Sequence, residues 1–139
     1  MDFDDFIRQG KVIKGEKDSQ KAKALIRMSD DILSFVSKLS VEETSASPIF
    51  SNAYEAIRQI LEAISLSQGY KVYSHEAYNS YLKSLKEEKL AITFDRLRKL
   101  RNGINYYGER VSKEITKEAI IQIKEACEEL KNKYLSDLK

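Results

Sequence analysis

The chain of 139 residues is poor in residues on which several protein classes depend: it has one cysteine, one histidine, one proline and no tryptophan. A single cysteine excludes an intramolecular disulfide framework within these residues. A single histidine excludes the histidine-rich metal sites, and we expect neither a metal nor a cofactor. The single proline and five glycines fall mostly between periodic segments, which favours long helices.

The charged residues nearly cancel, with 24 basic and 22 acidic side chains. This balance does not indicate a strongly basic nucleic-acid binder or an acidic tail. No apolar run approaches the ~18 residues of a membrane span. The acidic start Met1–Asp5 lacks the basic segment of a signal peptide. We therefore expect a cytoplasmic protein without a membrane partner, folded over 1–139 as a single domain.

Apolar residues recur every three or four positions along most of the chain, the spacing of one helix face. This periodicity predicts helices over 2–9, 18–39, 47–67, 74–88, 93–108, and from 112 or 116 to 135. The polar stretch 10–17 is predicted to connect the short first helix to the rest, and 40–47 to form a loop. The expected fold is all-α, an antiparallel up-and-down bundle of about five helices.

Helix ends are marked by capping residues. Ser47 followed by Pro48 predicts one helix start, and Ser74 predicts another. Gly69 is a predicted C-terminal stop. The runs 72–73 and 111–115 are too short to predict strands.

The segment 93–108 carries a polar strip beside an apolar face. At 100° per residue its core face is Leu97, Leu100, Ile104 and Tyr107. Along the border of that face lie two arginines and two amides: Arg98, Arg101, Asn102 and Asn105. Guanidinium groups bind phosphate oxygens through two hydrogen bonds, and amides can bond to a ribose or a base edge. The alternative interpretation pairs Arg101 with a glutamate of a neighbouring helix and leaves the asparagines in water.

The run Arg-Leu-Arg-Lys-Leu-Arg-Asn-Gly-Ile-Asn-Tyr-Tyr-Gly at 96–108 resembles the signature helix of the HEPN superfamily (higher eukaryotes and prokaryotes nucleotide-binding). That signature is an arginine, usually a polar residue next, and a histidine four to six positions further on. The stretches 54–57 and 69–77 also resemble small archaeal and bacterial HEPN-like proteins. The resemblance covers about 45–135, most of the chain.

The resemblance implies a bundle of about five helices that forms a homodimer with its arginine motifs facing each other. Many family members are metal-independent ribonucleases, often toxins. Others are partners of minimal nucleotidyltransferases, and some bind RNA or nucleotides without catalysis. Arg101 matches the motif arginine and Asn102 the polar second position. The histidine does not carry over, because the matching positions hold Tyr106, Tyr107 and Gly108.

Without that histidine, binding survives better than catalysis, because a tyrosine with a pKa near 10 is a poor base at neutral pH. We therefore expect a nucleotide- or RNA-binding protein with weakened or absent nuclease activity. A minimal nucleotidyltransferase, in a toxin–antitoxin pair, is a candidate partner. The candidate contacts are phosphate to Arg98 and Arg101, sugar or base to Asn102 and Asn105, and a stacking or donating Tyr106 or Tyr107.

Two other functions stay open. The first is an active metal-independent endoribonuclease in which Arg101 works with Tyr106 or with His75 as catalytic residues. The second is a non-catalytic structural or protein-interaction bundle. His75 begins a predicted helix, where a structural role is more common and the helix dipole favours the neutral ring. Tyr106 is also a candidate acceptor for modification by a nucleotidyltransferase. Cys127, on an apolar stripe, is predicted to be a buried hydrophobic residue.

Overall fold

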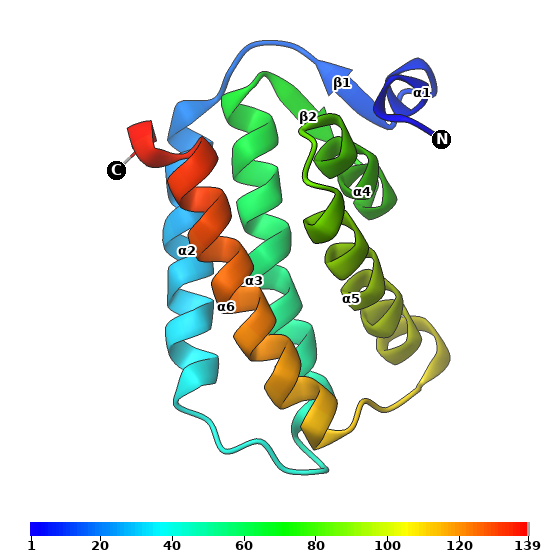
Figure 1. Cartoon of the computed structure of the whole chain (residues 1–139), viewed down its shortest axis with the longest axis vertical. Helices are drawn as coiled ribbons and strands as arrows, with labels where there is room; N and C mark the ends of the chain where they lie inside the picture. The colour runs from blue at the N-terminus through cyan, green and yellow to red at the C-terminus, as the bar shows by residue number, and fades with distance from the viewer. Residues whose placement is uncertain (139) are drawn as a thin grey trace.

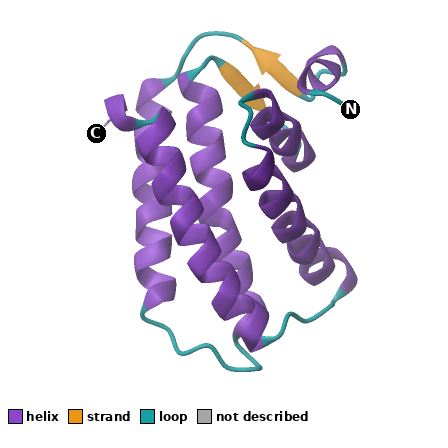
Figure 2. Cartoon of the chain, viewed as in Figure 1, coloured by secondary structure: helices purple, strands orange, loops and turns teal. Residues whose placement is uncertain are grey.

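The computed structural model describes residues 1–138 and is mostly helical (Figure 2). Its elements in chain order are α1 (Phe3–Arg8), β1 (Val12–Lys14), α2 (Ser19–Ser37), α3 (Ala46–Ser67), β2 (Tyr70–Val72), α4 (His75–Ser84), α5 (Glu88–Tyr107), α6 (Lys113–Tyr134) and a short 3-10 turn, η1 (Ser136–Leu138). The all-α class and the helical bundle are confirmed. None of the helices within this part of the chain combines the length and the hydrophobicity needed to cross a bilayer.

Helix α3 is the centre of the core. Most of its residues between Ala46 and Leu66 are buried, because apolar side chains occupy far more than one stripe of the helix. The stripe that reaches solvent holds Pro48, Asn52 and the partly exposed Arg58. Helices α2 and α6 pack on it from one side, while α4 and α5 follow one another along the other side (Figure 1). The candidate site lies on this second side, where three helices meet.

A two-stranded sheet, which the sequence did not predict, joins the segment between α1 and α2 to the segment between α3 and α4. β1 pairs antiparallel with β2, with Val12 opposite Val72 and Lys14 opposite Tyr70. Three-residue strands are too short to display a period of two, so the alternation test could not find them. Next to this sheet, the Gly15 N–H donates a hydrogen bond of 2.7 Å to the Gly69 carbonyl. β2 leads through Tyr73 and Ser74 to the first residue of α4, which is His75.

Two predicted caps differ in the structure. α3 begins at Ala46 after Ser45, and the Ser47 hydroxyl instead accepts a hydrogen bond of 2.8 Å from the Val111 N–H. Ser74 occupies the N-cap of α4 but makes no capping hydrogen bond with its side chain. Pro48 does lie in the first turn of α3, as predicted.

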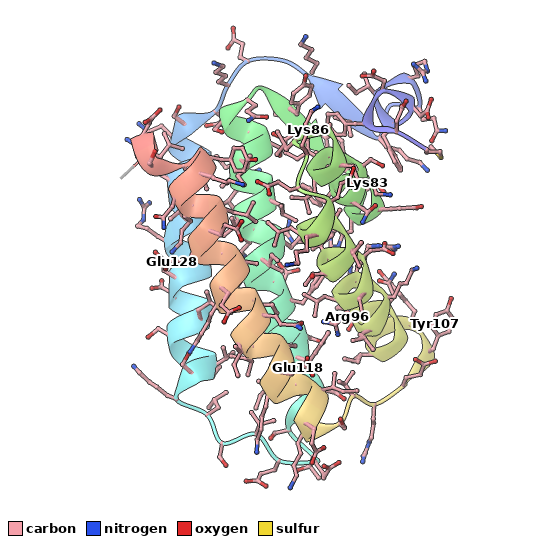
Figure 3. All side chains as sticks on the ribbon, in the orientation of Figure 1. Lys83, Lys86, Arg96, Tyr107, Glu118 and Glu128 are labelled. Atoms are coloured by element: carbon pink, nitrogen blue, oxygen red, sulfur yellow. The ribbon has the colours of Figure 1, made fainter. Side chains whose placement is uncertain are left out.

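The boundary between α4 and α5 also moved. α4 ends at Ser84 rather than near 88, because Lys86 adopts a left-handed conformation with φ of 63°. α5 consequently begins at Glu88, earlier than the predicted 93. Its burial stops at Gly103, one turn before the helix ends, so Tyr107 is 77% exposed and the prediction that it belongs to the core was wrong. Figure 3 shows Tyr107 extending away from the bundle.

Candidate anion-binding site

Side chains from α3, α4 and α5 meet at the ring of His75. The guanidinium Nη2 of Arg101, on α5, lies 2.6 Å from Nδ1 of His75, the first residue of α4. The hydroxyl of Tyr54, on α3, lies 2.9 Å from the same nitrogen. Each residue comes from a different helix, so the tertiary packing assembles the cluster.

Tyr54 provides the floor of the site. Its side chain is fully buried, and its ring stacks on Phe94 of α5 with centroids 5.6 Å apart. The Arg101 guanidinium lies over the Tyr54 ring, with its Cζ 5.0 Å from the ring centroid. A cation above an aromatic face is attracted to the ring quadrupole. Packing of Tyr54 therefore fixes where the Arg101 charge is held.

Three arginines in residues 1–138 are partly shielded from solvent, and two of them are neutralised. Arg58 bonds to Glu55 over 3.0 Å and to Glu62 over 2.8 Å. Arg98 pairs with Asp95 over 2.8 Å. Ion pairs of this kind compensate the cost of removing a charge from water.

Arg101 is the exception among these three. No carboxylate of residues 1–138 lies within ion-pair distance of it, and its Nε is buried without a hydrogen-bond partner. Its polar contact is with a ring nitrogen that carries no negative charge. A partly buried cation that lacks both an anion and a partner for one of its donors favours an anionic ligand.

More hydrogen-bond donors approach His75 Nδ1 than this atom can accept from. A neutral imidazole nitrogen that accepts has a single lone pair, but both the Arg101 N–H and the Tyr54 O–H reach this atom. One of the two donors is therefore in surplus. The surplus donor and the unpartnered Nε give the site unused hydrogen-bonding capacity that phosphate oxygens can fill.

The electrostatic surroundings keep the imidazole neutral. Burial lowers the pKa of His75 to about 4, and the positive charges of Arg101 and Arg58 act in the same direction, against the opposing charge of Glu55. At neutral pH the ring is thus an acceptor, as the contact with Arg101 requires. Burial raises the pKa of Tyr54 to about 12, so its hydroxyl keeps its proton.

The predicted site residues divide into two groups. Arg101 and Tyr106 come together, with the guanidinium Cζ 5.9 Å from the Tyr106 ring centroid. Asn102 is half-buried, whereas Asn105, Tyr106 and Tyr107 are exposed along the last turns of α5. On an ideal helix Asn105 lies about 40° and Asn102 about 100° from Arg101, whereas Tyr106 and Tyr107 lie about 140° and 120° away from it. Arg98 differs from Arg101 because it already forms an ion pair with Asp95, although its Nε is buried and has no hydrogen-bond partner.

Sequence reasoning missed Tyr54 as a site residue. It favoured a structural role for His75, while keeping this residue as an alternative catalytic group beside Arg101. Tyr54 lies on the apolar stripe of its helix, and nothing in that pattern distinguishes a core tyrosine from one that supports an arginine. For His75 a signal existed, since it is the chain's single histidine and lies within the stretch 69–77 that resembles the HEPN-like proteins. Its distance from Arg101 became visible only with the packing of α4 against α5.

Within residues 1–138 no three histidine, cysteine, aspartate or glutamate side chains gather as a metal site would require. Comparison of the sequence with models of known protein families finds no match, and comparison with curated proteins finds no significant match. The function is therefore argued from the site itself, together with the resemblance of 96–108.

Proposed function

We propose that the protein is a HEPN-like RNA- or nucleotide-binding protein in which Arg101 binds a phosphate group. The observation that carries the proposal is the state of this arginine: partly buried, without a carboxylate partner, and with an unpartnered buried Nε. A phosphate oxygen would supply both the charge and the acceptor that the guanidinium lacks. The arginine motif of the HEPN superfamily, which 96–108 resembles, supports the same assignment.

The surroundings of Arg101 suit a nucleotide better than inorganic phosphate alone. Tyr106 is 69% exposed beside the guanidinium and offers an aromatic face on which a base can stack. Asn102 and Asn105 provide amides for a sugar or base edge on the same helix. Tyr107, at the end of α5, extends this surface for a longer strand.

A binding assay with a matched control tests the proposal. We expect Arg101→Gln to weaken the binding of a fluorescent oligouridylate at least tenfold, and to reduce the dependence of affinity on salt. The control is Arg96→Gln, which removes an exposed arginine of the same helix, bonded to Gln122 of α6. We expect this variant to bind within twofold of the parent. Equal losses in the two variants would mean that only general charge is involved, and would contradict the assignment of Arg101.

The contact between His75 and Arg101 favours a second candidate, a metal-independent endoribonuclease. Nδ1 of His75, once Arg101 has turned from it to the phosphate, would take the proton of a ribose 2′-hydroxyl, whose oxygen attacks the phosphorus. Arg101 would stabilise the charge on the phosphate oxygens. The bond to the 5′ oxygen breaks, this oxygen takes a proton from solvent, and a 2′,3′-cyclic phosphate remains. A pKa of about 4 makes His75 a weak base in the free protein, which is why binding ranks first.

Cleavage of end-labelled RNA in excess chelator distinguishes the two candidates. A nuclease yields fragments with cyclic phosphate ends, and both His75→Gln and Arg101→Gln abolish them. If the parent protein binds RNA but produces no fragments, the binding function stands and the catalytic one falls. Tyr106→Phe tests the remaining candidate catalytic group in the same assay.

The resemblance further suggests a homodimer with a minimal nucleotidyltransferase as partner in a toxin–antitoxin pair. The surface of α4 and α5 near the site is the candidate dimer interface. Sedimentation of the purified protein tests the dimer, and a monomer at all concentrations would contradict it. Mass spectrometry after co-expression with a nucleotidyltransferase tests whether Tyr106 gains a nucleotide group.

A further inference from the structure

We propose that a phosphate bound at Arg101 displaces this residue from His75, and that the Tyr54 hydroxyl then becomes the hydrogen-bond partner of His75 Nδ1. The inference rests on the proposed function, because it requires a phosphate ligand at Arg101. It adds that binding changes the state of His75, and it assigns to Tyr54 the role of a positioning residue.

The competition at Nδ1 makes the exchange possible. Arg101 approaches to 2.6 Å and Tyr54 to 2.9 Å, so both donors are already within hydrogen-bond distance of one lone pair. When the guanidinium turns to a phosphate, Tyr54 can bond to Nδ1 without moving. His75 therefore keeps a partner and its orientation after Arg101 has left.

The two partners differ in what they allow the ring to do. A guanidinium only donates, so its contact with Nδ1 is compatible with a proton-free nitrogen and with no other state. A hydroxyl both donates and accepts, so Tyr54 can bond to Nδ1 with or without a proton there. Transfer from Arg101 to Tyr54 therefore releases His75 from a neutral state in which it is locked.

Among the charged groups around His75, Arg101 is the one whose charge a bound phosphate would neutralise. From α3 the ring is influenced by Arg58 and Glu55, and from α5 by Arg98 and Arg101. Tyr78, on the same helix as His75, lies with its ring centroid 6.4 Å from that of the imidazole. Arg58 and Arg98 are paired with carboxylates, whereas Arg101 is not. A phosphate that neutralises Arg101 removes the uncompensated repulsion that opposes protonation of His75.

The chain's single histidine makes the test direct, because its imidazole resonances in an NMR spectrum need no assignment by mutation. The probe is an oligothymidylate, which lacks the 2′-hydroxyl and so cannot be cleaved by attack of that group, and whose phosphodiesters keep their charge throughout the titration. We expect saturating probe to raise the pKa of His75 by at least one unit, a tenfold gain in proton affinity. In the absence of probe, we expect Arg101→Gln to raise this pKa as well.

Tyr54→Phe isolates the role of the hydroxyl, since it keeps the ring that stacks on Phe94. At a probe concentration that saturates this variant, we expect the proton affinity of its His75 to rise less than threefold. The melting curve of the variant confirms that it is folded before it is titrated.

The outcomes separate the inference from the proposed function. If the probe binds through Arg101 but leaves the pKa of His75 unchanged, the phosphate site stands and the exchange is refuted. An equal rise in the parent and in Tyr54→Phe would refute the role of Tyr54. If the probe shows no binding that depends on Arg101, the proposed function fails and the inference fails with it.

Discussion

Replacing Arg101 with methionine should stabilise the protein while it abolishes phosphate binding. The side chain of Arg101 is partly buried without an ion pair, so the folded state bears a desolvation cost that no carboxylate offsets. Methionine has a similar length and no charge, and its sulfur makes favourable contacts with aromatic rings such as that of Tyr54. Loss of the arginine strands no acceptor, because the Tyr54 hydroxyl still reaches His75.

The magnitude follows from opposing contributions. Removing the unpartnered Nε gains about 1–3 kcal/mol, and removing the desolvated charge gains a similar amount at partial burial. The lost hydrogen bond to His75 costs about 2 kcal/mol. The lost cation–π contact costs about 1 kcal/mol, of which the methionine sulfur recovers a part. The balance is an increase of roughly 1 kcal/mol in the free energy of unfolding, or about 4 °C in Tm for a chain of this size.

Arg58→Met is the matched control. This arginine is also shielded, with 16% of its side chain exposed, but it is paired with Glu55 and Glu62. Its removal leaves Glu55 without this partner and leaves the partly buried Glu62 with the ion pair to Lys21 at 3.4 Å. It should lower the free energy of unfolding by about 2 kcal/mol. Urea denaturation at pH 7 measures both variants. If Arg101→Met is destabilised as much as Arg58→Met, the idea that Arg101 is an uncompensated charge is wrong.

Three further predictions concern other residues. The free energy of unfolding should fall by about 1–2 kcal/mol between pH 7 and pH 5, because His75 has a folded pKa of about 4 and an unfolded pKa near 6.5. This contribution to stability is fully present above the unfolded pKa and is lost as the pH falls towards the folded pKa. In urea titrations, His75→Gln should remove this dependence on pH. Gly69→Ala should lower the free energy of unfolding by more than about 1 kcal/mol, because φ is +88° there and a Cβ would lie 2.6 Å from the Gly15 carbonyl oxygen. An unchanged Tm would contradict this close approach of Gly69 to Gly15. Cys127, whose pKa burial raises to about 12, should react with a thiol reagent only when urea unfolds the chain, and rapid labelling of the folded protein would show that α6 packs differently.

Most of the fold could be predicted from the sequence because it depends on local patterns. The spacing of apolar residues located α2, α3 and α6 to within a few residues, and Cys127 is buried as its stripe indicated. The ends of the helices were harder to predict from the sequence. Serine is common at N-caps, but Ser47 instead accepts a hydrogen bond from the N–H of Val111, a partner far away in the sequence. Such long-range competition for a side chain leaves no local trace.

The site was predictable only in the part that lies on one helix. Arg101 and Tyr106 could both be named from the sequence of α5, but not their contact: they are five residues apart, about 140° around an ideal helix, although the guanidinium Cζ lies 5.9 Å from the ring centroid. The approach of His75 to Arg101 depends on how α4 packs against α5, across 26 positions of the sequence. The carboxylates that neutralise Arg58 and Arg98 differ in this respect, because they lie within four residues of their partners and local spacing is enough to find them.

This difference in pairing separates Arg101 from Arg58 and Arg98, which carboxylates neutralise. A carboxylate beside Arg101 would stabilise the fold, but it would also compete with a phosphate for the same donors. Tyr54 and His75 hold the guanidinium by an aromatic face and a neutral nitrogen, neither of which carries negative charge. They therefore fix the position of Arg101 without neutralising it. An arginine held in this way retains its full charge for a ligand, at a cost in stability that Arg101→Met should recover.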